Sequence, residues 1–155
     1  MIELADKIYI GNSDDAYNCE KLNVGAVLNV AQDLETVCGW PLVDYAHVGL
    51  IDGPGNESMD YCAAVMVLSL LIRRRGDKDY LIMIYDHDGG RSLVIALMYL
   101  SLKTGRRGNV PSMPQVWTGW KENYDKIKAD NLPKVHASHI DAFEKLPFGL
   151  LEMLI

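Results

Sequence analysis

Residues 81–100 read LIMIYDHDGGRSLVIALMYL, and this stretch decides the fold. Its first five residues are apolar or aromatic and rich in β-formers, which is typical of a central strand covered on both faces. After the turn, apolar residues occupy nearly all sides of a predicted helix, so we expect that helix to be buried too. Gly89 and Gly90 permit positive φ, and Arg91 stands at the helix entrance. A glycine turn that aims backbone N–H groups and an arginine at one point predicts an anion site.

The chain has 155 residues, of which 49% are hydrophobic and 23% are charged. This composition indicates one soluble globular domain, residues 1–155, that is long enough to bury a core. The net charge of −6 argues against a broad nucleic-acid-binding surface or an acidic membrane surface, so neither partner is expected. The chain opens without a leader-like pattern, and its longest apolar run is too short to span a bilayer. We therefore expect a cytoplasmic protein.

The three cysteines, Cys19, Cys38 and Cys62, are scattered without CxxC spacing. Neither a disulfide framework nor a zinc site is indicated, and no metal or cofactor is predicted.

The rest of the chain alternates strand and helix patterns. We expect strands at 7–10, 24–30, 45–51 and 81–85, and helices from Ser13 or Asp14 to 22, from Ser58 to 75, and at 92–102, 115–129 and 138–146. This alternation predicts an α/β fold with a central, mostly parallel sheet flanked by helices. An apolar tail, residues 148–155, follows the last helix. We expect it either to pack back on the domain or to form a homodimer contact.

Four segments carry a resemblance, in their order and spacing, to a known family. They are KIYIGNSDDA (7–16), VGAVLNVAQDLE (24–35), HVGLIDGPGN (47–56) and the stretch 81–100. Together they resemble the dual-specificity branch of the cysteine-dependent protein tyrosine phosphatases, over about residues 4–146. The resemblance implies the dual-specificity-phosphatase fold. It also implies that 81–100 contains the phosphate-binding loop and its helix, and that Asp52 corresponds to the general acid.

The sequence departs from this family at the nucleophile. The family signature is HCxxxxxR followed by Ser or Thr. Alignment on Arg91 and Ser92 puts Ile84 at the histidine and Tyr85 at the cysteine, whereas a slide of one residue puts Asp86 there and leaves the arginine one position short. The family's reaction needs a thiolate, which neither alignment supplies. A phenol with a pKa of about 10 is a poor substitute, and a carboxylate repels the phosphoryl oxygens. We therefore expect no cysteine-dependent phosphatase chemistry.

The loop residues each have two interpretations. Arg91 either contacts a phosphate or forms a salt bridge with Asp86 or Asp88. The Ser92 hydroxyl either faces a ligand or caps the helix. His87 either binds a ligand or metal, or simply faces solvent.

Three further positions remain open. Asp52 is either a relic of the general acid close to the pocket or a turn residue. Tyr85 either stacks on a base or sugar in a remodelled pocket or plugs it. Trp117 and Trp120 lie on one helix face, which is typical of core residues and also fits ligand stacking.

The leading hypothesis is a catalytically inactive phosphatase-fold protein that binds a phosphorylated ligand in the former active-site cleft, as a sponge, a sensor or a phospho-recognition module. The ligand would be a phosphoprotein or a small, nucleotide-like molecule. The predicted binding residues are Tyr85, Asp86, His87, Asp88, Gly89, Gly90, Arg91, Ser92 and Asp52.

The alternative hypothesis is an active phosphatase with a nucleophile other than cysteine. LIMIYDHDGG also resembles the first motif of haloacid-dehalogenase-type phosphatases, an apolar strand followed by DxDG. That resemblance implies Asp86 as nucleophile and Asp88 as general acid, with magnesium bound. If the chain is instead an active enzyme of the dual-specificity-phosphatase type, its catalytic residues would be Asp52 and Asp86. A third hypothesis is a regulatory protein that recognises its partner through the tail 148–155.

Overall fold

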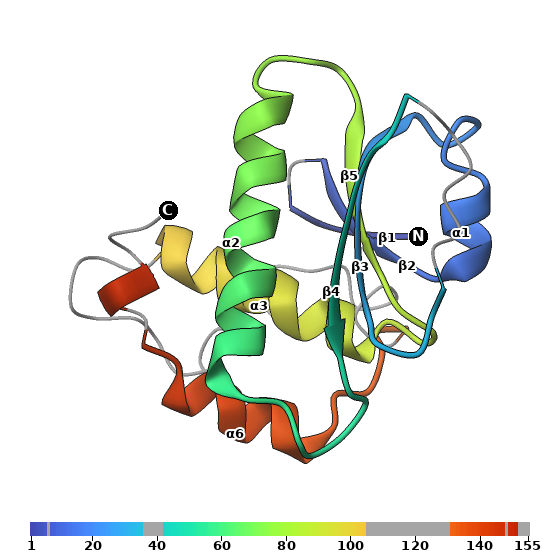
Figure 1. The fold of residues 1–155 in the computed structure, drawn as a ribbon. Coiled ribbons are helices and arrows are strands. Elements are labelled where there is room, and N and C mark those ends of the chain that lie inside the picture. Colours follow the sequence, from blue (N-terminus) through green and yellow to red (C-terminus); the bar gives the residue numbers. More distant parts are fainter. Residues whose placement is uncertain (6, 36–41, 105–130, 148, 152–155) are drawn as a thin grey trace.

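The computed structural model describes residues 1–5, 7–35, 42–104, 131–147 and 149–151 (Figure 1). These residues form a five-stranded sheet in the order β1-β2-β5-β3-β4. The strands are β1 (Ile2–Ala5), β2 (Ile8–Gly11), β3 (Val24–Ala31), β4 (Asp44–Leu50) and β5 (Leu81–Tyr85). Strands β2, β5, β3 and β4 run parallel, and β1 pairs antiparallel with β2. The predicted α/β fold with a mostly parallel sheet is confirmed.

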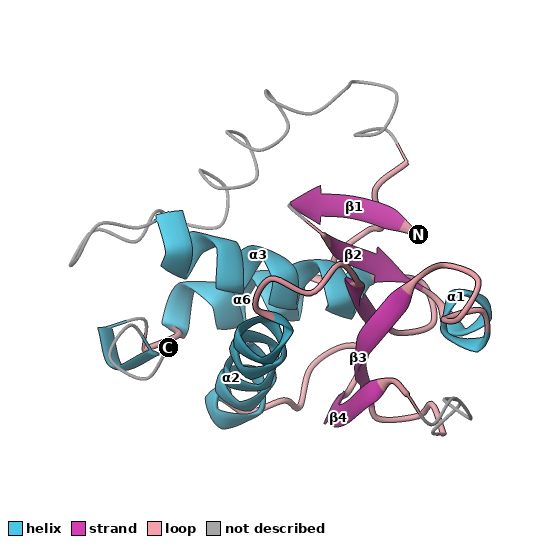
Figure 2. Ribbon diagram, turned by 90° about the horizontal axis from the view of Figure 1, so that it is seen from above, coloured by secondary structure: helices cyan, strands magenta, loops and turns pink. Residues whose placement is uncertain are grey.

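Helices cover both faces of the sheet. Helices α2 (Ser58–Arg75), α3 (Gly90–Thr104) and α6 (Ala137–Lys145) lie on one face, and the short α1 (Ser13–Tyr17) lies on the other (Figures 1 and 2). Each face has its own apolar cluster. The cluster under α2, α3 and α6 is the larger, and the cluster beside α1 includes Ala16, Val27, Met83 and Tyr85. Because β5 is buried on both faces, its sequence is a continuous apolar run.

Helix and strand ends differ from the sequence prediction in a few places. Strand β1 was not predicted, because its four residues carry no alternation long enough to detect. The first helix ends at Tyr17 instead of residue 22, and Asn12, one residue earlier than expected, caps it by accepting from the Asp15 N–H. Glu57 rather than Ser58 is the N-cap of α2, in a capping box with Asp60.

Some predicted features lie outside the described residues. These are the helix at 115–129 with Trp117 and Trp120, Cys38, and residues 148 and 152–155 of the apolar tail. Within the tail, Leu151 is buried in the main core cluster, so this part packs back on the domain. In the described part of the chain, no helix combines the length and apolarity that crossing a membrane requires.

The parallel strands bring distant segments to one edge. Strands β2, β3, β4 and β5 all end at the same side of the sheet, since they share one direction. The residues that follow β3, β4 and β5 include Asp33, Asp52 and Asp86. Clefts at the carboxyl edge of parallel sheets are common ligand sites. The predicted loop therefore lies where this fold favours binding.

Candidate anion site at the start of helix α3

Asp86 occupies the centre of the loop between β5 and α3. Its side chain is fully buried. Its Oδ2 accepts hydrogen bonds from the Arg91 backbone N–H (2.9 Å) and from Arg91 Nε (3.3 Å), and its Oδ1 accepts one from Ser92 Oγ (2.7 Å). The donors that were predicted to hold an external anion thus already hold a carboxylate of the same chain. The loop donors are therefore occupied by Asp86 in this structure.

Tyr85 and Ser92, two further predicted binding residues, lie in different parts of the structure. Tyr85 is fully buried in the cluster beside α1, so its side chain is not among the groups that form the loop. Its fully buried side chain offers no exposed face for stacking on a ligand in this structure. Ser92 donates to Asp86 from a fully buried position, so its hydroxyl neither caps the helix nor faces an open pocket.

The two glycines are required by a segment that lies over the loop. Gly89 has φ of +88°, and a Cβ there would be 2.8 Å from Pro133 Cγ. A Cβ on Gly90 would be 2.6 Å from the Lys134 carbonyl oxygen. Asp88 Oδ1 accepts from the Gly90 N–H (3.0 Å). Two backbone donors at the start of α3, those of Gly90 and Arg91, are therefore satisfied by side-chain carboxylates.

Arg91 is a buried guanidinium whose three acceptors come from two loops and the end of strand β4. Its side chain is 1% exposed, and besides Asp86 it contacts the loop after β3 and the last residue of β4. Nη1 donates to Asp33 Oδ1 (2.9 Å) and to the Leu50 carbonyl oxygen (2.8 Å). The predicted salt bridge to Asp86 is confirmed, and Asp33 is a second partner that the sequence did not indicate. Burial lowers the pKa of Arg91, but the two carboxylates outweigh this, so the net shift is upward and the charge is retained.

Asp33 joins Arg91 to His87 at the surface. Its Oδ2 lies 2.8 Å from His87 Nε2, and its side chain is 62% exposed, whereas that of His87 is 49% exposed. The hydrogen bond from Arg91 is the main reason that the pKa of Asp33 is lowered, and burial opposes it. His87 therefore faces solvent, as one of its two interpretations predicted, and is tied to the site through Asp33.

Asp52 lies on the loop after β4, beside α6. Its side chain is 54% exposed, and its Oδ1 is 3.8 Å from Nε2 of the fully buried His139. The other ring nitrogen of His139, Nδ1, lies 2.7 Å from the Tyr61 hydroxyl on α2. Asn56 fixes this loop, because its side chain accepts from the Ile51 N–H (2.7 Å) and donates to the Ile51 carbonyl oxygen (2.8 Å).

His139 is held in a mainly neutral state. Burial is the largest cause that lowers its pKa, Asp52 raises it, and His136 and Arg91 lower it. Asn56 also donates weakly to the Tyr61 hydroxyl (3.4 Å), and that hydroxyl shares a hydrogen bond with His139 Nδ1. The other ring nitrogen, Nε2, lies on the side of Asp52.

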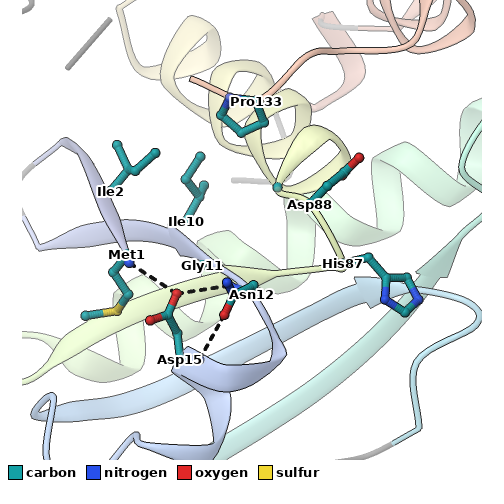
Figure 3. A pocket seen from close by; sticks show the side chains of 10 residues that line it. Met1, Ile2, Ile10, Gly11, Asn12, Asp15, His87, Asp88 and Pro133 are labelled. Carbon is teal, nitrogen blue, oxygen red and sulfur yellow. Dashed lines mark hydrogen bonds and ion pairs between the residues drawn. The ribbon is translucent and has the colours of Figure 1, made fainter. Parts of the chain in front are cut away.

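Two cavities lie near the site, one beside the loop itself and one beside Asp33. One has a volume of about 390 Å³ and is lined by Gln32, Asp33, Leu34, Glu35 and His47. The other has about 130 Å³ and includes Asp15, Asp88 and Pro133 in its lining (Figure 3). In Figure 3 the His87 ring is turned away from Asp15, in agreement with its contact to Asp33. Each cavity presents two carboxylates, Asp15 and Asp88 in the smaller one and Asp33 and Glu35 in the larger one, and the larger one contains Asp33, which is a partner of Arg91.

Most of the predicted binding residues lie together, with Asp86, Asp88, Gly89, Gly90, Arg91 and Ser92 in one loop and His87 at its rim. The sequence reasoning missed Asp33, His139 and Tyr61. Asp33 follows directly after a buried strand, which was an available signal, whereas nothing in the helical patterns singled out the other two. Among the described residues, no three His, Cys, Asp or Glu side chains are grouped as metal ligands.

The sheet order and the loop at the start of α3 define a class of fold. The chain has the fold of the dual-specificity and tyrosine phosphatases, which confirms the predicted fold. DUSP15 superposes with a TM-score of 0.71 at 16% identity, over 99% of this chain and 91% of that one. Human DUSP28 gives a TM-score of 0.68 at 16% identity, over 97% and 96% of the two chains.

A viral phosphatase shares the same fold. The tyrosine phosphatase OH1 from the Orf virus has a TM-score of 0.59 and 17% identity, over 100% of this chain and 86% of that one. No protein-family model matches the sequence, and no curated protein matches it either. At these identities the likeness establishes a phosphatase-like fold and nothing finer.

Proposed function

We propose that this chain is a catalytically inactive phosphatase-fold protein that binds a phosphorylated or nucleotide-like ligand in the cleft beside Arg91. Its role would be that of a sponge, a sensor or a phospho-recognition module. The observation that carries the proposal is the carboxylate of Asp86 at the centre of the loop. It supports both parts of the proposal, because it stands where a nucleophile would be needed and because the donors around it contact a carboxylate of the same chain, as they would contact a phosphate.

The case for inactivity rests on the state of Asp86. An attacking oxygen needs a free lone pair and open space in line with phosphorus. Asp86 is 0% exposed, and both its oxygens accept hydrogen bonds from Arg91 or Ser92. The two described cysteines, Cys19 and Cys62, are buried elsewhere in the fold. The alternative of an Asp86 nucleophile is therefore the weaker hypothesis.

The case for ligand binding rests on Arg91 and its surroundings. A guanidinium that keeps its charge in a nearly dry site is a strong partner for phosphate. The adjoining cavity of about 390 Å³ is within the size range of small-ligand sites. The partner class is thus a phosphorylated small molecule or a phosphoprotein, and the acidic chain gives no reason to propose a nucleic acid or a membrane.

Two assays test this function. We expect no hydrolysis of p-nitrophenyl phosphate, with or without Mg²⁺. We also expect calorimetry to detect binding of at least one member of a panel of inorganic phosphate, phosphotyrosine peptides and nucleotides. Arg91→Lys keeps the charge but loses the fork of donors, so it should weaken that binding without the risk of unfolding that Arg91→Ala carries.

Either assay can overturn the proposal. Turnover that depends on Mg²⁺ and disappears in Asp86→Asn would establish the alternative, an enzyme with an aspartate nucleophile. Absence of binding to every anion in the panel, with a correctly folded protein, would remove the binding function. The apolar tail 148–155 as a homodimer or partner contact stays a prediction, and gel filtration of a chain truncated after Pro147 tests it.

A further inference from the structure

Arg91 has two carboxylate partners that differ in exposure. Asp86 is 0% exposed and contacts Nε and the backbone N–H, and Asp33 is 62% exposed and contacts Nη1. Both partners are on loops at the carboxyl edge of the sheet. A ligand that approaches Arg91 from solvent therefore meets Asp33 first.

The inner partner is fixed by its other contacts. Asp86 also accepts the Ser92 hydroxyl, so its removal would leave a buried hydroxyl, a buried N–H and a buried guanidinium edge without their acceptor. Buried donors without acceptors are costly. Exchange of Asp86 for a ligand would also have to occur beneath Pro133 and Lys134, which contact the loop at Gly89 and Gly90. Asp86 thus behaves as part of the fold.

The outer partner has no such constraint. Besides its bond to Arg91, Asp33 contacts only surface-exposed groups in the described contacts, chiefly His87. Its side chain lines the cavity of about 390 Å³, so the carboxylate can turn into that space without movement of the backbone. If it does so, one donor on Arg91 and one on the His87 ring become available at the same point.

We propose that Asp33 is the exchangeable occupant of this anion site, and that a phosphate group binds by replacing the Asp33 carboxylate on Arg91 Nη1 and His87 Nε2 while Asp86 stays in place. This inference rests on the proposed function and names the residue that sets its affinity. Asp33 is a tethered competitor, since it is held near Arg91 at a high effective concentration by the chain. It lowers the affinity for weak anions and favours ligands that make further contacts in the cavity.

The charges support this assignment. Arg91 brings one positive charge, and Asp33 and Asp86 bring two negative charges, so the occupied site has an excess of negative charge. The hydrogen bond from Arg91 lowers the pKa of Asp33, so this competitor stays ionised at neutral pH. An incoming phosphate is repelled until Asp33 moves away. Removal of the Asp33 charge should therefore strengthen binding rather than weaken it.

The test is calorimetric titration of inorganic phosphate into the full chain and two variants. We expect Asp33→Asn to bind phosphate roughly five- to tenfold more tightly than the wild type, because it removes a charged competitor. Glu35→Gln is the matched control. It removes the same charge from the lining of the same cavity. Because the described hydrogen bonds of the Arg91 side chain go to Asp86, Asp33 and Leu50, we expect the phosphate affinity of this variant to change by less than about twofold.

A second measurement separates exchange from a general charge effect. In the wild type, phosphate should displace Asp33 from His87 and shift the NMR signals of that ring and of the Asp33 carboxyl carbon. In Glu35→Gln the same shifts should appear at similar phosphate concentrations.

The outcomes distinguish the two proposals. If Asp33→Asn binds phosphate no more tightly than the wild type, or more weakly, Asp33 is a ligand contact or a bystander, and this inference is overturned while the proposed function stands. If Asp33→Asn and Glu35→Gln tighten binding equally, the effect is long-range and the exchange is also excluded. If none of the three proteins binds phosphate or any other anion of the panel, both proposals fail.

Discussion

Two regions at the carboxyl edge of the sheet follow the same plan with different chemistry. Around Arg91 a buried charge contacts the buried Asp86 and the exposed Asp33. Around His139 a buried neutral ring contacts the buried Tyr61 hydroxyl and faces the exposed Asp52. In both regions the inner contact is enclosed by the core and the outer contact borders solvent.

The two regions differ in how closely the outer carboxylate is held. Asp33 lies 2.9 Å from the guanidinium, a hydrogen bond, whereas Asp52 is 3.8 Å from the imidazole and outside hydrogen-bond range. A permanent charge needs compensation, while a neutral ring does not. We infer that the inner contacts maintain the fold in both regions, and that only the Arg91 region pairs a charged group with an exchangeable anion.

The largest expected effect is on the inner contact of Arg91. Asp86→Asn removes the buried countercharge and should lower the free energy of unfolding by about 3–5 kcal/mol, measured by urea denaturation. Asp33→Asn removes the outer countercharge of the same guanidinium and should cost less than about 1 kcal/mol, because that carboxylate is solvated. Equal costs for the two variants would abolish the distinction between inner and outer partners.

A smaller effect is expected at the inner contact of His139. Tyr61→Phe leaves the buried Nδ1 atom without its hydrogen-bond partner and should cost about 1–2 kcal/mol in the same assay. Asp52→Asn is the comparison variant and should stay within about 0.5 kcal/mol of the wild type, since the outer contact is not a hydrogen bond. If Asp52→Asn lowers the free energy of unfolding more than Tyr61→Phe does, then α6 is held in place mainly by its contact with the loop after β4 and not by its contact with α2.

The smallest effect is a pH dependence of stability near neutral pH that comes from His139. Burial lowers the pKa of His139 below its ordinary 6.5. At a pH between the lowered pKa of the folded chain and the ordinary pKa of about 6.5, the unfolded chain binds a proton at this ring that the folded chain does not. The free energy of unfolding therefore falls as the pH drops below about 6.5. Urea denaturation at about pH 7.5 and about pH 5.5 should show a loss in the wild type that is reduced in His139→Asn. Parallel behaviour of the two proteins would contradict a buried, neutral His139.

The sequence was sufficient for the four parallel strands and for the loop, but not for strand β1 or for the partners that meet at the loop. The apolar run 81–85 and the glycines after it predicted β5 and the loop, because burial on both faces and positive φ leave local signals. Asp86 was recognised as a candidate because a slide of one residue puts it at the nucleophile position of the family signature and because it begins a DxDG motif. Asp33 is 58 residues away, and no local pattern reports a contact over that distance.

The direction of a side chain was also beyond the sequence. Tyr85 and Asp86 are neighbours at the end of a strand, and successive side chains of a strand point to opposite faces. Sequence alignment could not decide which of them lies in the loop, because the loop is one residue shorter than the family signature when it is read from Asp86. The structure places Tyr85 in the cluster beside α1 and Asp86 against Arg91.

The contact between α6 and α2 also has a consequence for the order of folding. The hydrogen bond between Tyr61 and His139 joins residues 78 apart in the chain, and closing so long a segment is entropically slow compared with forming the local pair of Asp86 and Arg91. We therefore expect the β5–α3 loop to form early and α6 to dock late. Before α6 docks, Arg91 would already be paired with the carboxylate of Asp86. The charge of Arg91 would therefore be compensated before the last helix buries it.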